Sequence, residues 1–250
     1  MSVEAFFDRL GLPEASRVDK RIFKRMVLDH GKLTAADKKA LSDDVSKLTW
    51  KYALKADTVQ VLPYEDAERE YLEIAIVEAL LSNRGRAARI AEIIQRAIPY
   101  PVLLVLVEGS GLCLNVAHKR FSRAEEGGIV AEGFLCSPWL EQPLSDLDRE
   151  FCQALALSRL SRVDFFALYR GMVNAVLARM CAEFSGTLVV DGRQPEQDRR
   201  QRLEQCHDLD REITSLRAVI RDQNRFADQV ELNTRIKELE ARLLEAKAGL

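Results

Sequence analysis

The C-terminal segment, residues 195–250, constrains the fold of this chain more than any other part. It has no proline after Pro195 and no glycine before Gly249, and charged residues occur at almost every second position. Apolar residues recur at intervals of three and four, which is the spacing of a coiled-coil seam. A seam on a single helix cannot bury itself, so the segment needs a covering surface. The seam consists of Cys206, Leu209, Ile213, Leu216, Ile220, Leu232, Ile236, Leu239, Leu243 and Ala246.

The seam changes register part-way along the segment. Its first part places heptad core positions at 206, 213 and 220, and its second part places them at 236 and 243, an offset of two residues. Stutters and stammers shift a coiled coil by four or three residues, so this offset predicts a break between 223 and 228. We expect two short antiparallel helices joined near Asn224. The alternative is one long bent helix that pairs with a second chain, and in either arrangement Asn233 could set the register or be solvated.

The length and composition are those of an ordinary protein that can bury a hydrophobic core. The chain has 250 residues and a formal net charge of -2, which gives no general attraction to nucleic acid or anionic membranes. Its longest apolar run, 101–107, is too short to span a bilayer, and acids stand where a signal peptide needs basic residues. We therefore expect a cytoplasmic protein with no membrane association. The five cysteines lack C-x-x-C spacing, and the histidines lack metal-ligand spacing, so we expect reduced thiols, no metal and no cofactor.

The middle of the chain predicts an α+β fold. Apolar residues alternate over 48–54 and 72–77, which is typical of strands with one buried face. An amphipathic helix over 86–97 is stopped by the Ile-Pro-Tyr-Pro sequence that follows it. We expect a small mixed β-sheet with flanking helices. The remaining predicted strands are 102–107, which is apolar throughout, its hairpin partner 112–117, and 129–135.

Helical segments flank this predicted sheet. We expect the first fifty residues to be mainly helical with loops, and Thr34 with Asp37 forms a capping-box pattern there. Ser145 with Asp148 repeats that pattern, and a further helix follows and ends at Gly186. The predicted organisation is an α+β domain over 1–141, a helical pair packed on it over 142–194, and a coiled coil or helical hairpin over 195–250.

Several short stretches carry a family resemblance. The most distinctive are Ile-Pro-Tyr-Pro at 98–101 and Val-Glu-Leu-Asn at 230–233, with further matches at 11–13, 20–24, 48–54 and 70–74. On these residues the chain resembles, nearly end to end, the bacterial family catalogued as domain of unknown function 4391. One departure is Phe23, which stands where a proline is expected. The resemblance implies an accessory component encoded beside helicases and DNA methyltransferases of restriction or phage-defence type, with no settled activity and no catalytic residue to carry over.

The leading functional expectation is a non-catalytic adaptor or assembly subunit. Residues 195–250 would bind a protein partner or a second copy through the coiled-coil seam, and any DNA contact would come through the partner. We expect nine residues of the segment to form the partner-binding face: Leu209, Ile213, Leu216, Ile220, Leu232, Asn233, Ile236, Leu239 and Leu243.

A second hypothesis is a nucleic-acid-binding accessory protein. Basic residues cluster between Arg17 and Arg25, and on a helix several of them would share a face, as phosphate recognition requires. Interspersed acids make an ordinary solvated surface the simpler interpretation. The candidate contacts are Arg17, Lys20, Arg21, Lys24 and Arg25, with Lys119 and Arg120 further along the chain.

A metal-dependent nuclease is the third hypothesis. Nucleases of the restriction type hold Mg²⁺ with an acid on one strand and an acid-x-Lys element on the next. Glu73 and Glu78 lie on or beside a predicted strand, and Lys119 ends another. Ala117 stands two positions before Lys119, where the acid is needed. The spacing therefore fails, and we assign no catalytic residue.

Overall fold

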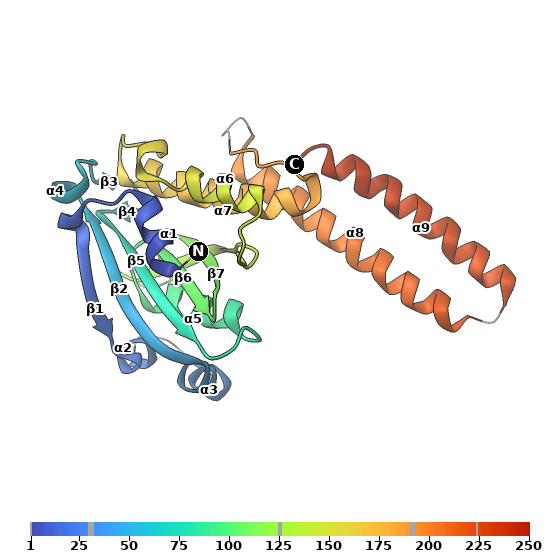
Figure 1. Ribbon diagram of the computed structural model, residues 1–250, viewed down its shortest axis with the longest axis horizontal. Helices are drawn as coiled ribbons and strands as arrows, with labels where there is room; N and C mark the ends of the chain where they lie inside the picture. The colour runs from blue at the N-terminus through green and yellow to red at the C-terminus, as the bar shows by residue number, and fades with distance from the viewer. Residues whose placement is uncertain (1, 30–32, 125–126, 191–193, 224) are drawn as a thin grey trace. The chain divides into compact units, whose positions relative to one another are not determined.

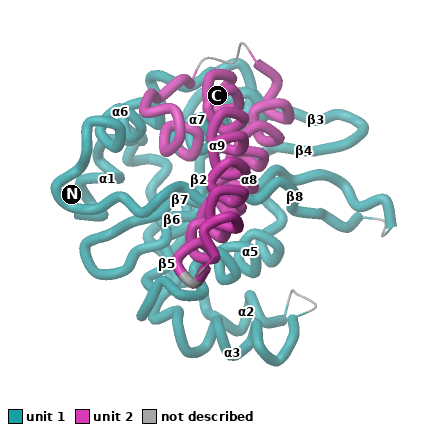
Figure 2. The backbone as a smooth tube through the Cα atoms, turned by 90° about the vertical axis from the view of Figure 1, so that its right-hand side faces the viewer, with its two compact units in different colours: residues 1–179 teal, residues 180–250 magenta. Residues whose placement is uncertain are grey.

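The computed structural model describes residues 2–29, 33–124, 127–190, 194–223 and 225–250. The chain divides into two compact units, residues 1–179 and 180–250, which Figure 2 shows in different colours. The boundary falls inside a single helix, α7 (Phe165–Ser185). The three-part division at 141 and 194 stays a prediction.

Unit 1 is built on a six-stranded mixed sheet with the order β1-β2-β5-β6-β7-β8. Neighbours β5 and β6 run parallel, and every other neighbouring pair in this sheet runs antiparallel. The predicted mixed sheet with flanking helices is thereby confirmed. The strands are β1 (Arg17–Ile22), β2 (Val45–Lys55), β5 (Glu73–Leu81), β6 (Val102–Glu108), β7 (Gly111–Phe121) and β8 (Ile129–Cys136).

The parallel pair exists because helix α5 (Ala87–Ala97) carries the chain back between β5 and β6. Its apolar side, which includes Ile90, Ile93 and Ile94, is buried in the core. Helices α2 (Lys24–Asp29) and α3 (Ala35–Asp44) contribute to the same core, beside Leu48, Val77 and other residues on one face of the sheet. Strand β6 lies in the middle of the sheet, which explains why its sequence is apolar throughout.

The remaining elements of unit 1 lie around this sheet. Helix α1 (Val3–Leu10) packs by Phe7 against Tyr52 of β2, with ring centroids 5.7 Å apart. Both predicted capping boxes are present, at Thr34 and at Ser145. The other elements are α4 (Ala56–Val59), α6 (Asp146–Ala154), the 3-10 helices Glu14–Ser16 and Leu157–Arg159, and a two-stranded sheet of β3 (Tyr64–Glu65) and β4 (Glu70–Tyr71).

The expectation of mainly helical structure with loops over the first fifty residues holds for α1, α2 and α3, but it missed a strand. Residues 17–22 form β1, and β2 already begins at Val45. Among the described strands, β1 pairs with β2 at the edge of the sheet, and its side chains are exposed or half-buried. An edge strand of this kind is commonly charged, so it shows little of the apolar alternation by which strands are identified.

Unit 2 contains the end of α7 and two long helices, α8 (Glu196–Asp222) and α9 (Phe226–Lys247). Helix α7 ends at Gly186, whose φ of 75° is the left-handed conformation that terminates helices. Helices α8 and α9 pack against each other and run antiparallel, as Figure 1 shows. The chain therefore forms the helical hairpin that the register offset predicts. Asn224, the expected joint, lies outside the described residues.

Candidate docking surfaces

The apolar seam of the tail is buried inside the hairpin. Leu209, Ile213, Ile236, Leu239 and Leu243 are all buried, and Leu239 is 0% exposed. Each helix supplies the surface that covers the stripe of the other. The requirement that the seam be covered is thus met by the chain itself. Leu216, Ile220 and Leu232 are half-buried.

This burial revises the expected partner-binding face. Side chains inside a closed hairpin are not available as an exposed stripe, so a partner of the closed hairpin has to meet other residues. Asn233 is exposed, and its Nδ2 donates to the Gln229 carbonyl of the same helix at 2.8 Å. This hydrogen bond lies within α9, so a role of Asn233 in the register between the two helices stays a prediction.

Ion pairs link the exposed borders of the two helices. Arg217 Nη2 lies 2.6 Å from Glu240 Oε1, and Arg235 Nη2 lies 3.2 Å from Glu212 Oε1. All four side chains are about half exposed, so each pair contributes about 0–1 kcal/mol and is weakened by salt. The pairs reinforce the antiparallel register that the seam establishes.

The two ends of the hairpin differ in how well they are covered. At the end near the chain terminus, Phe184 contacts His207 edge to face at 4.9 Å, and Lys247 Nζ lies 5.5 Å from the Phe184 ring centroid. Arg202 Nη1 donates to the Gly249 carbonyl at 2.7 Å. This end is therefore closed by rings, a cation and a hydrogen bond.

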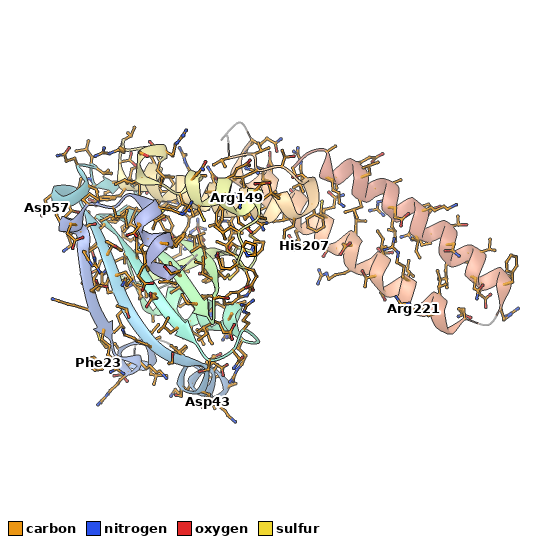
Figure 3. The ribbon with its side chains drawn as sticks, viewed as in Figure 1. Phe23, Asp43, Asp57, Arg149, His207 and Arg221 are labelled. Atoms are coloured by element: carbon orange, nitrogen blue, oxygen red, sulfur yellow. The ribbon has the colours of Figure 1, made fainter. Side chains whose placement is uncertain are left out.

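The opposite end carries exposed apolar side chains. Phe226, the first residue of α9, is 80% exposed, and Val219 and Val230 are 44% and 48% exposed. Phe226 and Val230 are four positions apart and share a face of α9. We call these three residues the hairpin tip. In Figure 3 the label of Arg221, near the end of α8, marks this end of the hairpin.

The basic segment 17–25 is not one helix face, which corrects the predicted alignment. Residues 17–22 are in β1, whose register with β2 shifts between Arg17 and Lys20, and from Lys20 to Ile22 successive side chains alternate between the two faces of the sheet. Arg17 pairs with Asp19, and Arg25 lies 3.5 Å from Asp29. Hydrogen bonds from Lys51 and Arg17 hold the pKa of the Asp19 carboxyl below its usual range.

Three further basic residues of this segment differ in their partners. Lys24 Nζ donates to the Ser42 carbonyl at 2.8 Å. Lys20 and Arg21 have no acidic partner within the part of the chain that the structure describes. Together with Lys24, whose hydrogen-bond partner is a neutral carbonyl, they are the positive charges of the segment without an acidic partner among the described residues.

An apolar pocket of about 370 Å³ opens beside this segment. Trp50, Ala75 and Val77 of the sheet contribute to its lining, and helix α2 adds Met26 and Val27. Met26 is exposed at the pocket although its side chain is apolar. The remaining lining residues are Ile22 of β1 and the sequence Ala97, Ile98, Pro99 and Tyr100 at the end of α5.

The burial of Lys119 disagrees with its predicted nucleic-acid contact, whereas the contact at Arg120 stays a prediction. Lys119 is 2% exposed, and its Nζ donates to the Ile98 carbonyl at 2.9 Å and to the Gln95 carbonyl. The ammonium group thus caps the C-terminal carbonyls of α5. Burial lowers the pKa of Lys119 to about 7. Arg120 Nε pairs with Glu132 at 2.6 Å.

The sequence analysis missed a buried polar cluster where β7 meets α7. The Tyr169 hydroxyl donates to the Val102 carbonyl at 2.8 Å, lies 3.0 Å from the Ala117 carbonyl, and accepts from the Ala117 amide at 3.1 Å. Tyr71 Oη lies 3.0 Å from His118 Nδ1. These groups satisfy polar atoms inside the core, so the cluster serves the fold. No spacing in the sequence could indicate contacts between residues so far apart.

The residues proposed for a nuclease are not brought together. Glu73 and Glu78 are five positions apart on β5, so they point to opposite faces of the sheet. Glu73 lies 3.5 Å from Lys55 Nζ, whereas burial raises the pKa of Glu78. Among the described residues, no three acids, histidines or cysteines are grouped in a way that could hold a metal ion.

Comparison with known proteins gives a family and no closer relative. A search of curated proteins and a search of solved structures each give no match. Within the described residues, every helix is too short or too polar to cross a membrane. The family described as Domain of unknown function (DUF4391) matches residues 10–243, nearly the whole chain. The chain therefore belongs to this family.

Proposed function

We propose that the chain is a non-catalytic adaptor or assembly subunit that binds a protein partner through its helical hairpin. The observation that carries this proposal is the hairpin tip, Val219, Phe226 and Val230. Phe226 is 80% exposed, and Val219 and Val230 at the same end of the hairpin are 44% and 48% exposed, so this end offers apolar surface for a partner to cover. Aromatic side chains are also frequent hot spots of protein interfaces.

The rest of the hairpin supports this role. Helix α8 has 27 residues, which corresponds to a length of about 40 Å. The buried seam joins it to α9, so the pair is stiffer than a single helix would be. A stiff two-helix element with an apolar end can present that end to a partner at little cost in conformational entropy.

The proposed setting is a bacterial restriction or phage-defence complex in the cytoplasm, with a helicase or DNA methyltransferase as the partner. This setting is supported only by what the family resemblance implies. DNA contact would then come through that partner. The hairpin tip and the setting are separate parts of the proposal, and the tip can be tested without the setting.

A capture experiment tests the tip. The full chain, with Phe226→Asp and Val230→Asp, is compared with the unchanged chain in an extract of a native host, and bound proteins are quantified by mass spectrometry. The matched control is Leu244→Asp, because Leu244 is an exposed apolar residue of the same helix outside the tip. We expect the tip variant to lose a stoichiometric partner that the control keeps. Equal recovery of all proteins by the three chains would contradict the proposal.

A second candidate function is nucleic-acid binding. Lys20 and Arg21, which have no acidic partner among the described residues, favour it. Binding through phosphates would weaken steeply as salt rises. The test is DNA binding by fluorescence anisotropy over a salt series, with Lys20→Glu and Arg21→Glu as the test variant. Lys38→Glu with Lys39→Glu, two exposed positions of α3, is the matched control. Binding that is equal in both variants would remove this candidate.

A further inference from the structure

The residues that line the pocket beside α2 suit the binding of an apolar group. Its sheet floor is formed by Trp50, Ala75 and Val77, and the small alanine leaves room above the strand. The Trp50 indole N–H already donates to the Tyr52 carbonyl at 2.8 Å. The floor therefore offers apolar contact and no free indole donor. With a volume of about 370 Å³, the pocket can admit a large side chain.

Exposed apolar residues extend the pocket outward. Met26 and Tyr100 line it and are also exposed. Phe23, at the junction of β1 and α2 in Figure 3, is exposed next to the lining residue Ile22. Arg21 lies over the Phe23 ring at 5.7 Å. An apolar surface that continues beyond the pocket suits a protein partner better than a small ligand, which is usually enclosed.

The charge at the edge of the pocket is positive. Lys20 is paired in register with Trp50, so it lies on the pocket face of the sheet. Lys24 and Arg25 begin the helix that supplies Met26. Within the described residues the nearby acid Asp29 is engaged by Arg25, and Asp19 is engaged by Arg17 and Lys51. The uncompensated charge favours an acidic partner segment.

We propose that this pocket and its basic edge form a second docking site, which takes an apolar side chain from an acidic segment of a partner protein. The site is separate from the hairpin tip, so it goes beyond the proposed function and can fail or succeed independently. A nucleic-acid base fits less well, because its polar edges need hydrogen-bond partners that this apolar lining does not supply. The basic edge alone would fit either class of macromolecule, and the pocket decides between them.

The test is a selection of random peptides displayed on phage, with the immobilised full chain as target. The best peptide is then synthesised with a fluorescent label, and its affinity is measured by polarisation. The expected winners carry one large apolar residue flanked by aspartate or glutamate. The Trp139→Phe substitution leaves Trp50 as the tryptophan that reports on the pocket. In a chain with this substitution, adding the peptide should change the Trp50 fluorescence, because Trp50 lines the pocket.

Variants at exposed positions separate binding from folding. Met26→Asp changes the pocket, Lys20→Glu with Arg25→Glu changes its edge, and Lys38→Glu with Lys39→Glu is the control for net charge. We expect each of the first two variants to weaken peptide binding by about tenfold or more, and we expect the control variant to leave the affinity unchanged. Equal urea midpoints for all chains would show that folding is intact.

Three outcomes would overturn the proposal. One is a selection that yields no peptide dependent on Met26, or only peptides without acids. Another is labelled single-stranded DNA that binds with the same dependence on these variants while no peptide does. The third is concentration-dependent self-association, measured by sedimentation, that the Met26→Asp variant abolishes, since the occupant would then be a second copy.

Discussion

The two units bury polar groups in different ways. Unit 1 holds buried side chains that each satisfy specific partners, such as Lys119 at the end of α5, Tyr169 between β6 and β7, and Arg179 against Asp148. The α8–α9 hairpin of unit 2 is joined by a narrow apolar seam with exposed ion pairs along its borders. A substitution at one of these anchors of unit 1 should therefore leave a buried group unpaired, whereas a substitution in the apolar seam of the hairpin should remove contact area.

This difference between the two units also separates the groups that stabilise the fold from the groups that are available to a partner. The polar anchors of unit 1 have almost no contact with solvent, so they fix the sheet and are not available to a partner. The hairpin buries its seam and leaves Phe226 exposed at one end. The following five predictions test this comparison, from the largest expected effect to the smallest.

Asp148→Ala should destabilise unit 1 by about 3 kcal/mol or more, because it leaves Arg179 buried without its charge partner. In the native chain Arg179 Nε and Nη2 lie 2.9 and 2.8 Å from Asp148 Oδ1. Urea unfolding followed by circular dichroism measures the change. Asp146→Ala is the control, since Asp146 is exposed and pairs with Arg149 on the surface. Similar losses in both variants would show that the burial of Asp148 is unimportant.

Leu239→Ala should destabilise the hairpin by about 3 kcal/mol through lost contact area and a cavity. Leu239 is 0% exposed, whereas Leu244 on the same helix is 71% exposed, so Leu244→Ala should have little effect. Hydrogen exchange of α8 and α9 amides measures the opening free energy of the hairpin. Equal exchange in the two variants would contradict the described seam.

Tyr169→Phe should cost about 2 kcal/mol, because it removes the hydroxyl that satisfies backbone groups of Val102 and Ala117. Phenylalanine keeps the ring, so the loss isolates the hydrogen bonds. Urea unfolding gives the loss in unfolding free energy. Amide hydrogen exchange should increase most in β6 and β7. A change below about 0.5 kcal/mol would mean that water replaces the hydroxyl without cost.

Lys119 should make the stability of unit 1 depend on pH. Its folded pKa of about 7 lies below the value of about 10.4 for an unfolded lysine. Between these values the unfolded chain binds more protons, so the unfolding free energy rises with pH. The two accepting carbonyls favour the charged form and reduce the effect, so we expect about 1 kcal/mol between about pH 7 and about pH 9.

The measurement for Lys119 is urea unfolding across that pH range for the unchanged chain and for Lys119→Met. The variant removes the amine and keeps an apolar chain of similar length. The difference in unfolding free energy between the two chains should increase with pH in favour of the unchanged chain. A difference that is flat with pH would contradict the lowered pKa.

The Arg217–Glu240 pair should contribute about 0.5 kcal/mol or less, because both side chains are exposed. A double-mutant cycle of Arg217→Ala and Glu240→Ala, read by hydrogen exchange of the hairpin, gives the coupling energy. The coupling should shrink further at high salt. A coupling above about 1.5 kcal/mol would place these ion pairs beside the seam as a main source of hairpin stability.

The sequence was sufficient to predict the elements that are indicated by local patterns of residues. The register offset between Ile220 and Ile236 predicts the break in the tail, and the Pro99 stop predicts the end of α5. Strand β1 was missed because an edge strand with Lys20 and Arg21 carries no apolar alternation. Sequence periodicity identifies a strand by its alternation of apolar and polar residues, and a charged edge strand has almost no such alternation.

The candidate sites were less accessible from sequence. The seam residues were predicted as a partner face because periodicity cannot distinguish an intramolecular cover from an external one. The pocket combines Met26, Trp50 and Tyr100, which are far apart in the sequence and adjacent only in the fold. Phe226 could have been noticed as an apolar residue outside both registers, since such a residue on a polar face is often exposed for binding.

Cross-linking with mixed isotopes tests most directly whether the hairpin closes within one chain and so leaves its tip for a partner. Chains carrying Arg217→Cys and Glu240→Cys are prepared with ¹⁴N and with ¹⁵N, mixed, and treated with a short bismaleimide. The native side chains at these positions pair across the two helices. We predict that cross-linked peptides joining α8 to α9 contain only one isotope. Peptides that join a ¹⁴N helix to a ¹⁵N helix in statistical proportion would show that the seam is shared between chains.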